Sequence, residues 1–195
     1  MISSFSFLHS KKVFLSKLDK SKKGSIDKKI KGLCKKINRL NNYYTTSSCS
    51  GRVVIIHIGK KKNEHKWLYI SHSKITKKEY DKIEKIYTQI WKDKNLLKTC
   101  WIRFEPAIIH VSCETIDDAQ KILDLARNTG FKLSGIISVK KNVVEIRASE
   151  RLDIPISVIL DVFALDNAIE EANKKLDETH NKIKRLTAKI SLLRK

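Results

Sequence analysis

The sequence predicts an α+β fold in which helices pack on an open mixed or antiparallel sheet, followed by a long C-terminal helix. Apolar residues recur at helical spacing in several segments, short β-branched and aromatic runs lie between them, and a heptad pattern occupies the C-terminal end. With 195 residues, of which 41% are hydrophobic, the chain has the length of one domain. We therefore expect a single domain over residues 1–195.

The first predicted elements are a helix and a strand hairpin. Residues 26–41 carry apolar side chains at helical spacing, and Ser25 or Asp27 is placed to cap the start. The runs "VVIIHI" (53–58) and "KWLYIS" (66–71) flank the polar segment "GKKKNEH". They predict two strands joined by a hairpin with a basic tip.

Two further helices have clear start signals. Thr76 and Glu79 have the spacing of a capping box ahead of a second apolar stripe. Thr115 and Asp118 open a third helix, and Gly130 is a suitable C-terminal stop.

The remaining strand-like segments contain a proline and a glycine. "CWIRFEPAIIHVSC" (100–113) is strand-like on both sides of Pro106, which predicts a kink there. Residues 131–139 and 143–149 predict another hairpin, with Gly135 at a close approach or a bulge.

The C-terminal segment 162–195 predicts one long helix with a heptad seam. The seam consists of the apolar or small residues 165, 169, 172, 176, 179, 183, 186, 190 and 193. Thr179 weakens its middle. Two arrangements remain open: the seam packs against its own domain, or it zips to a second copy and makes a homodimer.

The positive charge is concentrated in the first half of the chain. Residues 1–103 hold 26 Lys and Arg against 7 Asp and Glu, whereas residues 104–195 hold 15 against 14. A lysine-rich host composition would charge both halves. The asymmetry favours a polyanion bound by the first half, since counterion release needs clustered cations. We expect this polyanion to be a nucleic acid.

Other compositional features exclude several classes of protein. No apolar segment approaches the roughly 20 residues of a membrane span, so we expect a cytoplasmic protein without membrane contact. The four cysteines are scattered, without a C-x-x-C pair, which predicts reduced thiols and no structural metal. The absence of G-x-G-x-x-G and Walker motifs makes a Rossmann nucleotide-binding domain improbable.

The stretch "TTSSCSGR" (45–52), which we call the octet, is the first candidate site. It holds five hydroxyls, a glycine and Arg52 between a predicted helix and a predicted strand, where we expect a loop. Such a loop can cradle a carboxylate or phosphate, and a plain hydroxyl-rich turn is the alternative. Upstream, Ser25 and Asp27 at a helix start either cap the helix or help to bind an anion.

Three further polar residues interrupt apolar elements. His72 ends a predicted strand, Glu105 precedes Pro106, and His110 lies within "IIHV". A lone histidine in an apolar strand is more often a hydrogen-bonded core residue than a catalyst. His72, at a strand end, is the stronger candidate.

In this order, the motifs resemble a known family, the wybutosine-synthesising tRNA methyltransferases that act third in their pathway. The motifs are "KKGSIDK", "TTSSCSGR", "WLYISH", "IRFEPAIIHV", "DDAQKILDLARNTGFKLSGI", "IRASERLDIPI" and "EEANKKLDETHNKIKRL". The resemblance implies an enzyme that uses S-adenosyl-L-methionine to methylate N4 of a 4-demethylwyosine-type base beside the anticodon of phenylalanine tRNA. It also implies an α+β fold unlike the Rossmann methyltransferases.

The resemblance further implies the site residues, matched position by position. Binding of the donor or the substrate falls to Ser25, Thr45, Thr46, Ser47, Ser48, Cys49, Gly51, Arg52, Glu105, Pro106, His110, Ser134, Gly135 and Arg147. Methylation of a nitrogen requires removal of its proton, for which Asp27 is the first candidate and His72 the second. Arg52 and Arg147 would clamp a phosphate or the donor's carboxylate.

Two other functions remain open from the residues alone. The chain could be a non-catalytic RNA-binding module in which the octet grips a phosphate, or an architectural dimer joined through the heptad helix. If the chain binds RNA, we expect contacts with tRNA from the basic residues Lys20, Lys22, Lys23, Lys60, Lys61 and Lys62.

Overall fold

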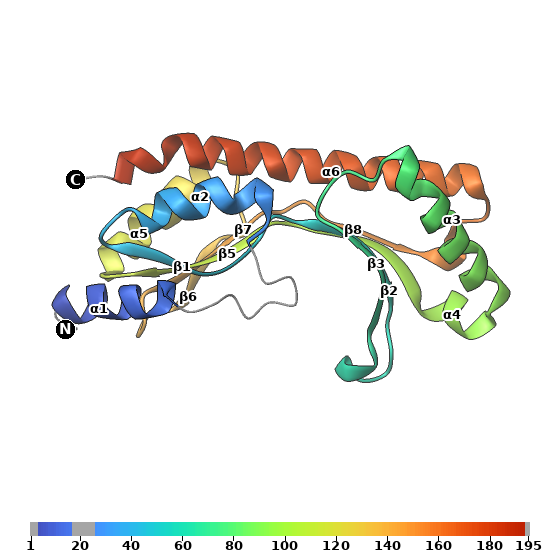
Figure 1. Ribbon diagram of the computed structural model, residues 1–195, viewed down its shortest axis with the longest axis horizontal. Helices are drawn as coiled ribbons and strands as arrows, with labels where there is room; N and C mark the ends of the chain where they lie inside the picture. Colours follow the sequence, from blue (N-terminus) through green and yellow to red (C-terminus); the bar gives the residue numbers. More distant parts are fainter. Residues whose placement is uncertain (1–3, 17–25, 194–195) are drawn as a thin grey trace. The chain divides into compact units, whose positions relative to one another are not determined.

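The structure, a computed structural model, describes residues 4–16 and 26–193, which fall into two compact units (Figure 1). Unit 1 comprises Met1–Ser50, Ala107–Ser149 and Thr179–Lys195, and unit 2 comprises Gly51–Pro106 and Glu150–Glu178. Each unit has its own sheet and its own hydrophobic core.

Unit 1 is built on a four-stranded antiparallel sheet in the order β1-β5-β7-β6. Its strands are β1 Tyr43–Cys49, β5 Ile108–Cys113, β6 Gly135–Ser138 and β7 Val143–Arg147. Its helical elements are α1 Ser4–Leu15, α2 Lys28–Asn38, α5 Ile116–Asn128, the end of α6 Val162–Lys189 and the 3-10 turn η3 Ile190–Leu193.

The helices of unit 1 use the two faces of its sheet differently. Figure 1 shows α2 and α5 on one face and α1 on the other. The core under α2 and α5 includes the fully buried Ile30, Ile109 and Phe131. On the α1 side, Phe7 and Phe14 pack against the ring of Tyr44, with centroids at 5.4 and 5.5 Å.

Unit 2 is built on a second antiparallel sheet in the order β3-β2-β4-β8. Its strands are β2 Arg52–His57, β3 Lys66–Ser71, β4 Cys100–Glu105 and β8 Leu152–Pro155. Its helical elements are η1 Lys62–Glu64, α3 Lys77–Lys92, α4 Lys94–Thr99, η2 Ile156–Val158 and the start of α6. The helices bury one face of the sheet, around Ile55, Ile83 and Phe104.

The fold class predicted from the sequence is confirmed, with two antiparallel sheets where one was expected. The capping box of α3 is present, because Glu79 accepts from the backbone N–H of Thr76 at 3.0 Å. At α5, the hydroxyl of Thr115 accepts from the backbone N–H of Asp118 at 3.0 Å. Pro106 does more than kink a strand, since β4 and β5 on its two sides belong to different sheets.

Two local predictions were wrong. Residues 45–49 of the octet form most of β1 rather than a loop, and only Ser50 and Gly51 lie between β1 and β2. Gly135 makes no close approach, because a Cβ there would meet no atom within 4 Å. A register shift between Ile136 and Ser138 places an irregularity just beyond it.

The seam of α6 packs within its own chain. Leu165, Ile169, Ala172 and Leu176 belong to the core of unit 2, and its later members belong to the core of unit 1. These later members are Ile183, Leu186 and Ile190. Of the two arrangements left open by the sequence, the structure has the first. Among the described helices, none combines the length and apolar character needed to cross a membrane.

Gly130 and Gly32 should respond in opposite ways to substitution by alanine. Gly130, after α5, has φ +106°, and an alanine Cβ there would meet Arg185 and Lys182 side-chain atoms at 3.2 Å. Gly130→Ala should therefore lower the free energy of unfolding by about 1 kcal/mol or more. Gly32 lies inside α2, where an alanine Cβ would meet no neighbouring atom within 4 Å. Gly32→Ala should raise the free energy of unfolding by roughly 0.5–1 kcal/mol. Urea denaturation of both variants measures the two changes in the free energy of unfolding. If both changes had the same sign, the prediction would be contradicted.

Candidate functional site

Asp27 ties the start of α2 to the end of β1. Its side chain makes no cap bond to α2. Instead, Oδ2 accepts from the backbone N–H of Ser50 at 3.0 Å and from the Ser50 hydroxyl at 3.2 Å. Both residues are buried, with Ser50 fully enclosed. Asp27 thus occupies the N-cap position, as predicted, but its side chain does not cap the helix, and its carboxylate binds Ser50 of the octet.

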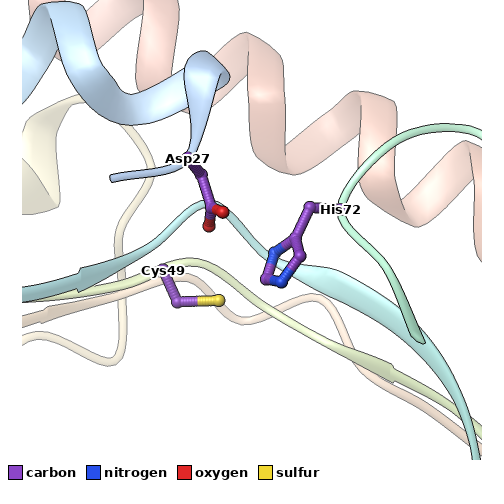
Figure 2. A group of neighbouring side chains, drawn as sticks. All are labelled: Asp27, Cys49 and His72. Atoms are coloured by element: carbon purple, nitrogen blue, oxygen red, sulfur yellow. The ribbon is translucent and has the colours of Figure 1, made fainter. Parts of the chain in front are cut away.

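The carboxylate of Asp27 also lies near the thiol of Cys49. Figure 2 shows Asp27 directed from the start of α2 toward the strand that carries Cys49. A carboxylate oxygen and Sγ are within 4.8 Å of each other. Cys49 is half-buried, at the last position of β1. An anionic group thus lies at the end of β1 in unit 1.

His72 contacts Gly51, the residue that follows Ser50, within unit 2. It follows β3, and its Nδ1 lies 3.1 Å from the carbonyl oxygen of Gly51 (Figure 2). Gly51 has φ +89°, in the left-handed region that favours glycine, so it makes the turn from β1 into β2. Asp27 and His72 therefore bind consecutive residues, Ser50 and Gly51.

Some hydroxyls of the octet face α2. The backbone N–H of Thr45 donates to Oδ1 of Asn38 at 2.7 Å, and its hydroxyl lies 3.1 Å from the amide nitrogen. Burial raises the pKa of the Cys34 thiol on α2, while hydrogen bonds with Ser48 and Thr45 act in the opposite sense. Thr45 and Ser48 thus attach β1 to α2.

Ser47 faces the other side of the sheet. Its hydroxyl lies 3.0 Å from Nδ1 of His110 on β5, whose Nε2 lies 3.0 Å from Oε2 of Glu145 on β7. Arg147 Nη1 is 3.8 Å from the second oxygen, Oε1, of Glu145. Thr46 donates to the carbonyl of His110 at 3.4 Å. We call Ser47, His110, Glu145 and Arg147 the polar ladder.

Arg52 is fixed by two neighbours in unit 2. It pairs with Glu105 across β2 and β4, and its Nε donates to Oε2 of Glu105 at 2.6 Å. Its guanidinium also lies over the ring of Trp67, 4.4 Å from the centroid. Glu105 thus balances the charge of Arg52 and, together with Trp67, orients it.

Ser134 has a structural environment. It is 3% exposed, and its hydroxyl donates to the carbonyl of Phe131 at 2.7 Å and accepts from the backbone N–H of Arg147 at 3.0 Å. Arg127 donates to the carbonyl of Ser134 at 2.9 Å. These bonds fix the approach to β6 rather than present a group to a ligand.

The four cysteines are free thiols, as the sequence predicted. Burial raises the pKa of Cys100 to about 11 and, with the charge of Asp118, that of Cys113 to about 12. Both thiols are therefore protonated, and poor nucleophiles, at neutral pH.

The predicted RNA-binding lysines are only partly described. Lys60 and Lys61 are exposed between β2 and β3, and Lys62 begins the turn η1. Gly59 allows this tip to close, since a Cβ there would lie 2.3 Å from Cβ of Glu64. Outside the described residues lie Lys20, Lys22, Lys23 and Ser25.

Comparison with known sequences places these residues in a family. The sequence profile described as methyltransferase TYW3 matches residues 9–192, nearly the whole chain. The chain belongs to this family. The match covers Asp27, the octet, His72 and the polar ladder. The solved structures that this TYW3-family chain resembles are likewise not Rossmann proteins.

Curated relatives are similar over most of their length. The chain is 39% identical over 198 residues to a Thermococcus sibiricus protein named tRNA(Phe) 7-((3-amino-3-carboxypropyl)-4-demethylwyosine(37)-N(4))-methyltransferase, covering 96% of this chain and 95% of the relative. A Pyrococcus horikoshii protein of the same name, numbered 1, is 38% identical, with 88% of each chain covered. A Xenopus laevis tRNA wybutosine-synthesizing protein 3 homolog is 32% identical, with 92% and 72% covered.

Solved structures have the same fold. The structure of PH1069 protein from Pyrococcus horikoshii superposes with a TM-score of 0.81 at 32% identity, covering 97% of this chain and 98% of that one. A protein from Aeropyrum pernix gives a TM-score of 0.69 at 27% identity, with 86% and 98% covered.

Three residues that contact the candidate side chains had no signal in the sequence. Asn38 ends α2 and binds Thr45, Trp67 stacks on Arg52, and Glu145 binds His110. Each is an ordinary residue within its own segment. Their roles depend on strand register and helix packing, which a single sequence does not specify.

Two of the predicted site serines, Ser134 and Ser47, should differ in how much they contribute to stability. Ser134→Ala leaves the Arg147 N–H and the Phe131 carbonyl without their buried partner, so the free energy of unfolding should fall by about 1–3 kcal/mol. Ser47→Ala removes an exposed hydroxyl and should change it by roughly 0.5 kcal/mol or less. Chemical denaturation of both variants compares them. A larger destabilisation by Ser47→Ala would make that residue structural.

Proposed function

We propose that this protein transfers a methyl group from S-adenosyl-L-methionine to N4 of a 4-demethylwyosine-type base beside the anticodon of phenylalanine tRNA. The family match over residues 9–192 carries the proposal. Relatives named for this reaction match 88% or more of the chain at 38–39% identity. The reaction belongs to wybutosine biosynthesis, and we propose a cytoplasmic location for it.

The residues at the end of β1 fit the proposed donor. S-adenosyl-L-methionine carries a sulfonium cation and supplies an electrophilic methyl group when bound. The carboxylate of Asp27 is 6% exposed and has the charge that such a cation requires. Aligning donor and acceptor is then the main task of the protein, since near-attack geometry contributes several kcal/mol.

Asp27 is our first candidate to accept the proton of the substrate nitrogen. Its two bonds from Ser50 both end on Oδ2, which holds that oxygen at the end of β1. His72 is the second candidate, and its bond to the Gly51 carbonyl fixes its ring in the same way within unit 2. Both side chains are thus positioned by the backbone that follows β1.

The charge distribution supports tRNA as the partner. The net charge of residues 1–103 is +19, whereas that of residues 104–195 is +1. The hairpin tip with Lys60 and Lys61 is exposed and projects from the unit 2 sheet (Figure 1). A homodimer through the α6 seam is not supported, because that seam lies in the two cores of one chain.

A direct binding measurement distinguishes the enzyme from a non-catalytic RNA-binding module. Calorimetric titration of the protein with S-adenosyl-L-methionine should give saturable binding. Incubation with labelled donor and unmethylated phenylalanine tRNA should transfer the label. Binding of tRNA without binding of the donor would contradict the proposal and favour the module.

Asp27→Asn should abolish most turnover while leaving donor affinity nearly unchanged. Asparagine keeps the shape and can still accept from Ser50, but it no longer accepts a proton. The expected decrease in kcat is about 100- to 10,000-fold, and the acid limb of the pH-rate profile should disappear.

Asp124→Asn is the matched control for Asp27→Asn. Asp124 lies exposed on α5 in the same unit and accepts a hydrogen bond from Gln120. It should leave kcat and the pH profile unchanged. Full activity of Asp27→Asn would assign the proton-accepting role to His72 or to water.

The lysines of the hairpin tip should contribute to tRNA affinity through their charge. Replacing Lys60 and Lys61 by Gln should reduce the slope of log affinity against log salt by roughly 0.9 for each phosphate that is no longer neutralised. Lys140 and Lys141, exposed in the second half of the chain, provide a control pair with the same change in charge. Filter binding at several salt concentrations gives both slopes. An unchanged slope in the tip variant would locate the RNA elsewhere.

A further inference from the structure

The register of the unit 1 sheet creates the polar ladder. Ser47 on β1 is directly opposite His110 on β5, and His110 is directly opposite Glu145 on β7. Directly opposed side chains in an antiparallel pair lie about 4.5–5.5 Å apart at Cβ. Three strands therefore align one hydroxyl, one imidazole and one carboxylate in a row.

The carboxylate determines the direction of the hydrogen bonds along this row. An ionised carboxylate only accepts hydrogen bonds, so Nε2 of His110 donates to Glu145. In a neutral imidazole the other nitrogen is then an acceptor. The hydroxyl of Ser47 consequently donates to Nδ1 of His110. Glu145 thus sets the tautomer of His110 and the orientation of the Ser47 proton.

This direction of the hydrogen bonds leaves acceptor atoms of Ser47 and Glu145 on the solvent side of the row. The oxygen of Ser47 keeps its lone pairs, and Oε1 of Glu145 faces the guanidinium of Arg147 at a loose 3.8 Å. The side chain of Glu145 is 21% exposed and that of Arg147 is 46% exposed. Hydrogen-bond acceptors therefore adjoin an accessible cation on the face of the sheet that carries α1 (Figure 1).

We propose that the polar ladder binds the headgroup of an α-amino acid, with Glu145 and Ser47 accepting from its ammonium and Arg147 binding its carboxylate. A zwitterionic headgroup requires acceptors and a guanidinium side by side, and charge-assisted bonds of this kind are strong. Glu145 has a second role as the positioning residue of His110. This inference rests on the proposed function, because that function supplies the ligands.

Two molecules of the proposed reaction contain this headgroup. One is the methionine part of S-adenosyl-L-methionine. The other is the 3-amino-3-carboxypropyl chain that the names of the relatives place on the substrate base. The chemistry recognised by the ladder is the same for both, so variants must be tested against each.

The tautomer can be tested without any ligand. In 15N-edited spectra of the wild-type protein at pH 8, His110 should show Nε2 protonated and Nδ1 unprotonated. Glu145→Gln should weaken this preference, because a glutamine amide can donate as well as accept. A wild-type ring protonated at Nδ1 would overturn the proposed direction of the ladder.

Binding measurements test the ligand. Glu145→Gln and Arg147→Gln should each raise the Kd of the molecule that supplies the headgroup, either the donor or the tRNA, by about 10- to 100-fold. If the source is the donor, binding of S-adenosyl-L-methionine should weaken, while binding of 5′-methylthioadenosine, which lacks the headgroup, should not. If the source is the base, binding of tRNA carrying the aminocarboxypropyl chain should weaken, while binding of tRNA without that chain should not.

Lys140→Gln is the matched control, because Lys140 is exposed in the turn of the same β6–β7 hairpin and the substitution removes the same charge. It should leave every Kd unchanged, and melting temperatures should show that all three variants fold. If Glu145→Gln and Arg147→Gln weaken binding of neither the donor nor the tRNA, the headgroup site is overturned and the proposed function stands. If the wild-type protein binds no donor and transfers no methyl group, both fail.

Discussion

The hydrogen bonds from Ser50 to Asp27 are the constraint around which unit 1 is arranged. They hold a buried carboxylate at the start of α2 against the end of β1, so a helix end and a strand end share one anchor. Loss of these bonds would deprive a buried carboxylate of two hydrogen-bond donors, which is costly because bonds to charged groups are stronger than those between neutral groups. In the proposed reaction, the same bonds would hold the carboxylate that accepts the proton of the substrate nitrogen.

The helices α2, α3, α5 and α6 could be predicted from the sequence because each has a repeating apolar stripe, whereas α1 and α4 were not predicted. α3 and α5 begin where Thr76 and Thr115 predict. The strand β1 could not be predicted from the sequence, since a run of hydroxyl side chains is equally compatible with a loop. Its strand character depends on pairing with β5 and on Asn38, which binds Thr45.

Candidate site residues could be named from the sequence, but their contacts with one another could not. The resemblance supplied Asp27, His72, His110 and Arg147 without saying which of them interact. Glu145 was missed because a glutamate in "VVEIR" is an ordinary solvent-facing residue until the register places it opposite His110. Arg52, which the resemblance implies as a clamp, is oriented within unit 2 by Glu105 and Trp67, and neither contact could be predicted from the sequence.

One strand directs its polar side chains to two faces of the sheet. Thr45 and Ser48 face α2 and attach the strand to the core, while Ser47 faces the polar ladder. β1 is the edge strand of its sheet and pairs only with β5. The backbone N–H of Thr45 therefore donates to the side chain of Asn38 on α2 instead of to a neighbouring strand. Pairing on one edge and attachment to a helix on the other hold the hydroxyls of β1 in a fixed alternation between two faces, which a loop of the same composition would not do.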